Sequence, residues 1–196
     1  MTNLVALGVT FLLTYTVGYK DQPDPAVAGS GEQGTGAAPV LEGAAVCAPL
    51  TVGAPVGGRV IPSGQIPDET FAAGILGTGV GIEPEDGTVL APFDGVVTTV
   101  ADTRHAVGVT SLDGVEVLIH IGVDTVDMNG EGFTAHVEEG QKSHKGDRLL
   151  SFDRGRIAAA GHPDIVVMLV TNGDDFSRVS IRTGPAEVLA AVIDVE

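Results

Sequence analysis

The chain has 196 residues, which is enough for one domain and an extension. A net charge of −16, from 26 Asp and Glu against 10 Lys and Arg, argues against a nucleic-acid-binding protein and suits a basic protein partner. The single cysteine, Cys47, excludes an internal disulfide and fits a reducing compartment. With 43% hydrophobic residues, 28 Gly and no Trp, the composition is typical of a β-rich core of aliphatic side chains.

The first segment, residues 1–21, is predicted to form an apolar helix. Its apolar run extends from Leu4 to about Tyr19 and ends at Lys20 and Asp21. The run is slightly shorter than the roughly 20 residues of a free-standing membrane helix, and no Lys or Arg precedes it as in a signal peptide. Composition alone leaves three alternatives open: a membrane helix, a signal peptide, or the tail of a membrane domain whose earlier helices lie outside this chain.

Residues 22–46 are predicted to be a flexible linker. Pro, Gly, Ala and Ser dominate this segment, aromatic residues are absent, and no hydrophobic period is present. As a coil, about 25 residues would span on the order of 25–30 Å.

Residues 47–196 carry the fold, and their pattern predicts an all-β domain, an antiparallel sandwich or barrel with little helix. Short apolar runs alternate with turns that contain Gly, Asp or Asn. A turn is expected within residues 67–76 and a short helix within 153–161, where Asp153 can cap the first turn and Gly161 can end the helix. The predicted strands lie within 79–84, 88–101, 106–123, 147–152 and 165–172.

Residues 105–122 are predicted to form a β-hairpin around the two-residue turn Asp113-Gly114. In that register His105 and His120 would share one face as diagonal neighbours, with Cβ atoms roughly 7–8 Å apart. The register sets three pairs opposite one another: Leu112 and Val115, Val107 and His120, and His105 and Gly122. The histidine face would also carry Val107, Val109, Leu118 and Glu116, and the core face would carry Thr110, Val117, Ile119 and Ile121.

Two histidines at this distance support three kinds of chemistry. A neutral imidazole is a nucleophile near pH 7, so one ring could take a phosphoryl group while the other hydrogen-bonds its oxygens. The pair could instead bind zinc together with Asp124, or the carboxylate could simply orient one ring. A coincidental pair of structural histidines is a further alternative, and His136, His144 and His162 are expected on the surface.

Two partial resemblances lack their essential residues. The stretch His-Ile-Gly-Val-Asp at 120–124 is similar to the His-x-Gly-x-Asp of lysostaphin-type zinc peptidases, but no His-x-His follows it. Segments 91–97 and 137–150 are similar to lipoyl and biotinyl carrier domains, but no Lys lies between Asp94 and Gly140 to carry the group. A hydrolase and a carrier of this kind are therefore disfavoured.

A third resemblance extends from about Ala48 to the C-terminus. The matching segments, in order, are APLT, IPDETFAAGILGTGVGIEP, LAPFDGVV, DTRHAVGV, GVEVLIHIGVDTVDMNGEGF, EEGQKSHKGDRLLSFD and VTN. They follow the order found in the glucose-type IIA domain of the bacterial phosphoenolpyruvate:sugar phosphotransferase system, and the step from His105 to His120 also fits. The chain is identified as a member of that family. Residues 1–21 are similar to the end of the IIC permease domain that precedes IIA in fused transporters.

The resemblance implies a role for each site residue. His120 would accept a phosphoryl group from phosphohistidine on HPr and pass it to a cysteine on the IIB domain, which phosphorylates the incoming sugar. His105 would hydrogen-bond the phosphoryl group, Thr103 would support His105, and the Gly122 carbonyl would receive the other ring nitrogen of His120. The implied partner-binding residues are Asp68 and Asp124 at the rim, the apolar Phe71 and Leu118, and Val126.

The resemblance also implies a setting. The IIA domain would be cytoplasmic and could be tethered to the membrane through residues 4–19, with no metal or cofactor besides the phosphoryl group on histidine. A regulatory module switched by His120 phosphorylation is the alternative function. The chain departs from the family at 52–65, which is longer than usual, and at Val166-Val167, where Thr-Pro is usual. No IIB cysteine motif is present, so the phosphoryl group would leave to another domain or polypeptide.

Overall fold

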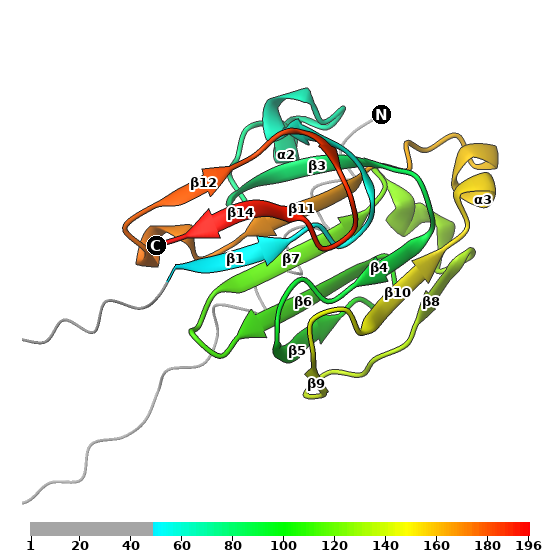
Figure 1. Cartoon of the computed structure of the whole chain (residues 1–196). Coiled ribbons are helices and arrows are strands. Elements are labelled where there is room, and N and C mark those ends of the chain that lie inside the picture. The colour runs from blue at the N-terminus through cyan, green and yellow to red at the C-terminus, as the bar shows by residue number, and fades with distance from the viewer. Residues whose placement is uncertain (1–48) are drawn as a thin grey trace, which may run out of the picture. The chain divides into compact units, whose positions relative to one another are not determined.

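The computed structural model describes residues 49–196, and the helix and linker predicted for residues 1–46 lie outside the described residues. Strands dominate this part of the chain, so the predicted all-β fold with little helix is confirmed (Figure 1). The elements are β1 (Leu50–Gly53), β2 (Gly58–Pro62), η1 (Ser63–Gln65), α2 (Glu69–Ala72), β3 (Thr78–Pro84), β4 (Thr88–Leu90), β5 (Gly95–Val100), β6 (Ala106–Ser111), β7 (Glu116–Ile121), η2 (Thr125–Met128), β8 (Phe133–Ala135), β9 (Lys142–Ser143), β10 (Arg148–Phe152), α3 (Arg154–Ala159), β11 (Val166–Val170), η3 (Gly173–Asp175), β12 (Val179–Ile181), β13 (Gly184–Ala186) and β14 (Ala191–Val195), where η marks a 3-10 turn.

The strands of this region form three antiparallel sheets. The largest has eight strands in the order β13-β2-β3-β11-β7-β6-β5-β9, and the smaller sheets have the orders β1-β14-β12 and β4-β10-β8. One main hydrophobic core joins all three sheets, because Val52 of β1, Leu149 of β10 and Ile119 of β7 belong to the same buried cluster. The sheets therefore form a sandwich around a largely aliphatic core, as a composition without Trp favours.

Strand β7 separates this main core from a second cluster through the alternation of its side chains. Val117, Ile119 and Ile121 are buried in the main core, whereas Leu118 and His120 project from the other face. Strand β11 is buried on both faces, as its continuous apolar run indicates. The smaller cluster on the face of His120, called here the histidine-side cluster, consists of Ile61, Ile66, Phe71, Val123, Ile165, Val167 and Leu169.

The β6–β7 hairpin is present, but its predicted turn is wrong by one residue. The chain reverses through a three-residue loop, 112–114, rather than through Asp113-Gly114 alone. Ser111 and Val115 close the loop, since the Ser111 N–H donates to the Val115 carbonyl at 2.9 Å. Gly114 has a φ of +84°, the left-handed conformation that commonly ends a three-residue hairpin loop.

The shifted register changes which side chains share a face. Ala106, rather than Val107, lies opposite His120. Val107 and Val109, which were predicted beside the histidines, are buried in the main core. Thr110, which was predicted in the core, pairs with Glu116 and so shares the face of His120.

The segment 67–76, predicted as a turn, contains the short helix α2, and the short helix predicted within 153–161 is present as α3. The carboxylate of Asp153 caps α3 by accepting a hydrogen bond from the Arg156 N–H at 3.0 Å. Gly161 follows the helix with a φ of +86°, which a left-handed helix stop requires. No helix within residues 49–196 is long and apolar enough to cross a membrane.

Candidate functional site

His120 lies one residue before the end of β7, in a row of residues that crosses five strands of the largest sheet. The register sets Ile61 of β2, Gly81 of β3, Val167 of β11, His120 of β7 and Ala106 of β6 side by side. Residues paired in antiparallel strands project from the same face. The imidazole therefore stands between a valine and an alanine, on the face opposite the main core.

Packing around this row depends on a glycine in β3. A Cβ atom on Gly81 would come within 3.1 Å of three isoleucine side chains of the histidine-side cluster. The missing side chain thus lets these residues pack over β3 on the face of His120. Phe71, which is only 6% exposed, completes the surroundings: its ring centroid lies 5.1 Å from that of His120, with an interplanar angle of 58°.

A backbone carbonyl two residues further along the chain holds the ring of His120. The ring Nδ1 lies 2.9 Å from the carbonyl oxygen of Gly122, and because a carbonyl can only accept, the ring N–H must donate. Gly122 has a φ of +77°, a conformation open to glycine that turns its carbonyl back toward the ring. A proton on Nδ1 leaves the lone pair on Nε2, so this contact selects the tautomer in which Nε2 is nucleophilic.

His105 comes from the turn before β6, so strand alternation does not set its direction. Arg104 before it has a left-handed φ of +57°, and the His105 carbonyl accepts a hydrogen bond from the Ile121 N–H at 2.8 Å. Its ring meets that of His120 edge to face, with 4.7 Å between centroids and an interplanar angle of 81°. The hydroxyl of Thr103 lies 2.5 Å from Nδ1 of His105. The three polar side chains are therefore brought together.

Both histidines are neutral at physiological pH. Burial lowers the pKa of His105 from 6.5 to about 4. Burial, together with repulsion from His105, lowers the pKa of His120 from 6.5 to about 3, and the hydrogen bond to the Gly122 carbonyl acts in the opposite direction. Removing water from an imidazole disfavours its charged form, so each ring keeps a free lone pair near pH 7.

The five residues predicted to bind partners differ in their surroundings. Asp68 caps α2, because its carboxylate accepts a hydrogen bond from the Phe71 N–H at 2.8 Å. Leu118 lies on the face of His120 and is partly exposed. Asp124 is exposed with a left-handed φ of +57°, and Val126 is 43% exposed. Asp124, Val126 and Leu118 therefore offer surface, whereas Asp68 also positions the phenyl ring beside His120.

Two contributions to the site were not predicted from the sequence. Val167 and Leu169 border the histidine strand across β11. The apolar run of 165–170 could have indicated their position, because such a run is typical of a strand buried on both faces. Thr125 is fully buried, and its hydroxyl donates to the Ile121 carbonyl at 2.5 Å. No sequence signal separates this threonine from an ordinary turn residue.

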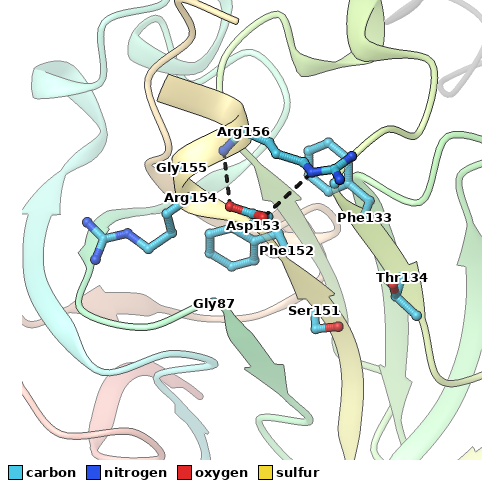
Figure 2. A pocket seen from close by; sticks show the side chains of 10 residues that line it. Gly87, Phe133, Thr134, Ser151, Phe152, Asp153, Arg154, Gly155 and Arg156 are labelled. Atoms are coloured by element: carbon cyan, nitrogen blue, oxygen red, sulfur yellow. Dashed lines mark hydrogen bonds and ion pairs between the residues drawn. The ribbon is translucent and has the colours of Figure 1, made fainter. Parts of the chain in front are cut away.

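A surface pocket of 730 Å³ lies where β8 and β10 meet the first turn of α3 (Figure 2). Its two arginines already have carboxylate partners, Asp164 at 2.6 Å from Arg154 and Asp153 at 3.7 Å from Arg156. Figure 2 shows these two side chains pointing to opposite sides of the helix turn, and no histidine lines the pocket. Among residues 49–196, no three His, Cys, Asp or Glu side chains are grouped to hold a metal ion. The histidine pair is therefore the candidate site.

The sequence of the domain matches known proteins. Residues 50–176 match the family described as phosphoenolpyruvate-dependent sugar phosphotransferase system, EIIA 1. The chain is 45% identical over 146 residues to the raffinose carrier protein of Pediococcus pentosaceus. The match covers 74% of this chain and 23% of the carrier protein. It is also 45% identical over 142 residues to the PTS system beta-glucoside-specific EIIBCA component of Bacillus subtilis. That match covers 70% of this chain and 23% of the EIIBCA component. The chain thus spans less than a quarter of the length of these curated relatives.

The fold also matches a solved structure. Glucose permease IIA from Mycoplasma capricolum superposes with a TM-score of 0.67 at 30% identity, over 75% of this chain and 96% of that chain. The match therefore includes almost the whole of that IIA protein. Sequence and fold agree that this chain belongs to the EIIA 1 family of the phosphoenolpyruvate-dependent sugar phosphotransferase system, with a IIA domain of the glucose type.

Proposed function

We propose that this domain is a phosphocarrier in which His120 accepts a phosphoryl group from the phosphohistidine of HPr and passes it to a IIB cysteine. The observation that carries the proposal is the hydrogen bond from Nδ1 of His120 to the Gly122 carbonyl, in a ring that burial keeps neutral. Such a ring has its lone pair on Nε2 and needs no general base to attack phosphorus. Membership of the EIIA 1 family supports the same role.

Two transfer steps follow from this arrangement. In the first, the lone pair on Nε2 of His120 forms a new N–P bond while the N–P bond of the donor breaks, and the donor imidazole leaves with that electron pair. In the second, a IIB thiolate forms an S–P bond, and the Nε2–P bond breaks to return a neutral His120. Both steps conserve charge and need no cofactor, because the phosphoryl group itself is the carried species.

The neighbours of His120 would tune how long the phosphoryl group survives. With the Thr103 hydroxyl donating to Nδ1 of His105, the His105 proton would lie on Nε2 and could donate to a phosphoryl oxygen. The histidine-side cluster would limit the access of water, which would otherwise hydrolyse the N–P bond. The exposed Asp124 and Val126 would belong to the docking surface.

The partners and the setting belong to the same proposal. The relative from Bacillus subtilis is an EIIBCA component, which supports a IIB and IIC context for this domain. HPr would be the donor, and a basic donor surface would be steered toward a chain with a net charge of −16. We place the domain on the cytoplasmic face of the membrane, where it would serve the uptake and phosphorylation of a sugar.

Phosphoryl acceptance tests the proposal directly. The protein is incubated with enzyme I, HPr and radiolabelled phosphoenolpyruvate, and the wild type should gain an acid-labile label. His120→Gln should gain none, because the nucleophilic nitrogen is gone. His144→Gln is the matched control, since this exposed histidine lies outside the site and should be dispensable for labelling. A label on His120→Gln would contradict the assignment.

The role proposed for His105 is tested at the second step. His105→Gln should still accept the phosphoryl group, because its amide leaves His120 intact. Its transfer to a purified IIB domain should be slow, because the amide cannot reproduce the position of the imidazole N–H. Transfer at the wild-type rate would remove His105 from the mechanism.

A further inference from the structure

We propose that Thr125 is a positioning residue for His120, because it holds the turn whose carbonyl fixes the tautomer of the imidazole. The inference rests on the proposed function, since its main consequence is measured as phosphoryl acceptance. Thr125 is the first residue of η2 and has no exposed surface, although threonines in turns are mostly exposed. A buried hydroxyl there calls for a structural reason.

The hydroxyl of Thr125 acts on the peptide group that precedes the key carbonyl. It donates to the carbonyl oxygen of Ile121 at 2.5 Å. That carbonyl belongs to the planar peptide group joining Ile121 to Gly122, so fixing the oxygen fixes the whole plane. With this plane fixed, the φ of +77° at Gly122 contributes to the direction of the next carbonyl, which accepts the proton of Nδ1 of His120.

The methyl group of Thr125 acts on the glycine itself. A Cβ atom on Gly122 would lie 2.2 Å from Cγ2 of Thr125, so the methyl occupies the space that glycine leaves free. The backbone of this turn is also held by hydrogen bonds from the Gly122 N–H to the Ile165 carbonyl at 2.8 Å and from the Val123 N–H to the Pro163 carbonyl at 3.2 Å. Thr125 therefore adds a side chain that contacts the turn at two places, the Ile121 carbonyl and Gly122.

The backbone explains why Thr125 can reach back to β7. Gly122 and Asp124 both have left-handed φ angles, +77° and +57°. Two such residues within three positions reverse the chain, so that the side chain two residues after Val123 folds over the end of the strand it has just left. The hydroxyl then contacts the Ile121 carbonyl and the methyl packs against Gly122. Substitutions at Thr125 can remove these two contacts one at a time.

Two variants divide the side chain in this way. Thr125→Val keeps the shape and removes the donor, so the rate of phosphoryl acceptance from phospho-HPr should fall about tenfold, the loss expected from one buried hydrogen bond. In 15N NMR spectra, the proton of His120 should be shared between Nδ1 and Nε2 instead of residing on Nδ1. Thr125→Ser keeps the donor and should retain the wild-type tautomer, with a rate within about twofold of the wild type.

Two controls separate positioning from general loss of stability. Thr171→Val removes a hydroxyl that donates to the Glu116 carbonyl at 3.4 Å, at the other end of β7. Ile193→Val trims a fully buried residue of the main core in β14 and should lower the melting temperature. Both variants should keep the wild-type tautomer and rate. A normal tautomer and rate in Thr125→Val would overturn the proposal, and so would the same tautomer mixing in Ile193→Val.

The outcomes stay informative if one variant or the proposed function fails. If Thr125→Val does not fold, Thr125→Ser is compared with Thr125→Ala: serine should keep the tautomer, alanine should lose it, and equal tautomers would overturn the proposal. If the folded wild type gains no label on His120, the phosphocarrier function fails. The NMR comparison of tautomers then still decides whether Thr125 positions the imidazole.

Discussion

At His120, the chemistry of the residue depends on what surrounds each part of its ring. Nδ1 donates to the Gly122 carbonyl, while the rings of His105 and Phe71 lie 4.7 and 5.1 Å away between centroids. Burial lowers the pKa of His120 more than the Gly122 carbonyl raises it. The same surroundings therefore keep the ring both neutral and oriented, and a histidine nucleophile needs both conditions together.

Removing the phenyl ring of Phe71 should reverse much of the lowering of the His120 pKa that burial causes. Because burial is the main cause of the lowered value, Phe71→Ala should admit water and raise the pKa of His120 from about 3 toward 6.5. An NMR titration of the His120 ring protons measures this shift. Phe176→Ala, which removes a ring packed against the main core, should leave the pKa of His120 unchanged. An unchanged pKa in Phe71→Ala would show that the other neighbours alone exclude water.

At the scale of elements, regular strands were predictable and irregular ones were not. The apolar runs of β3, β10 and β11 gave a clear pattern, and α3 has both its cap Asp153 and its stop Gly161. The strands β1, β2, β8, β9, β12, β13 and β14 lie outside the predicted segments. Among them, β12 and β13 have only three residues each, and none of these residues is buried. The segment 52–65, which departs from the family spacing, contains β2 and so belongs to the largest sheet.

The two histidines were predicted to meet, but from a register that is wrong by one residue. An Asp-Gly pair suits both a two-residue turn and a three-residue loop that ends in a left-handed glycine. A distant residue contacts the loop here, because the Asn172 amide donates to the Gly114 carbonyl and accepts from the Glu116 N–H, each at 2.9 Å. Local sequence cannot report such a contact. The rings still meet, because His105 lies outside β6 in a turn of its own.

Two glycines with similar φ angles should respond differently to alanine. Gly114→Ala, at φ +84° with open space around the new Cβ, should lower the free energy of unfolding by about 1–2 kcal/mol, the cost of a left-handed alanine. Gly122→Ala would also clash with Thr125 at 2.2 Å, so it should cost more and displace the carbonyl that binds His120. Urea unfolding and phosphoryl labelling of both variants check this. Equal labelling would show that the turn at Gly122 tolerates a side chain.

At the scale of the whole molecule, the two histidines of the candidate site lower the stability of the fold in acid. They are partly buried beside apolar side chains at one face of the largest sheet, where a charged imidazole is poorly solvated. The unfolded chain can protonate both rings below their ordinary pKa of 6.5, whereas the folded chain cannot do so until about pH 4 and about pH 3. Folding and the proposed phosphoryl chemistry thus depend on the same exclusion of water.

The stability of the protein should therefore fall as the pH is lowered from 6.5 toward 4. In this range the unfolded state binds more protons than the folded state, so the free energy of unfolding rises with pH, and each histidine contributes at most about 1.4 kcal/mol per pH unit. The double variant His105→Gln/His120→Gln lacks both protonation sites, so its free energy of unfolding should depend less on pH. Urea unfolding of both proteins at several pH values measures the two slopes. Parallel slopes would mean that the folded protein protonates these rings as readily as the unfolded chain does, and that water reaches the site.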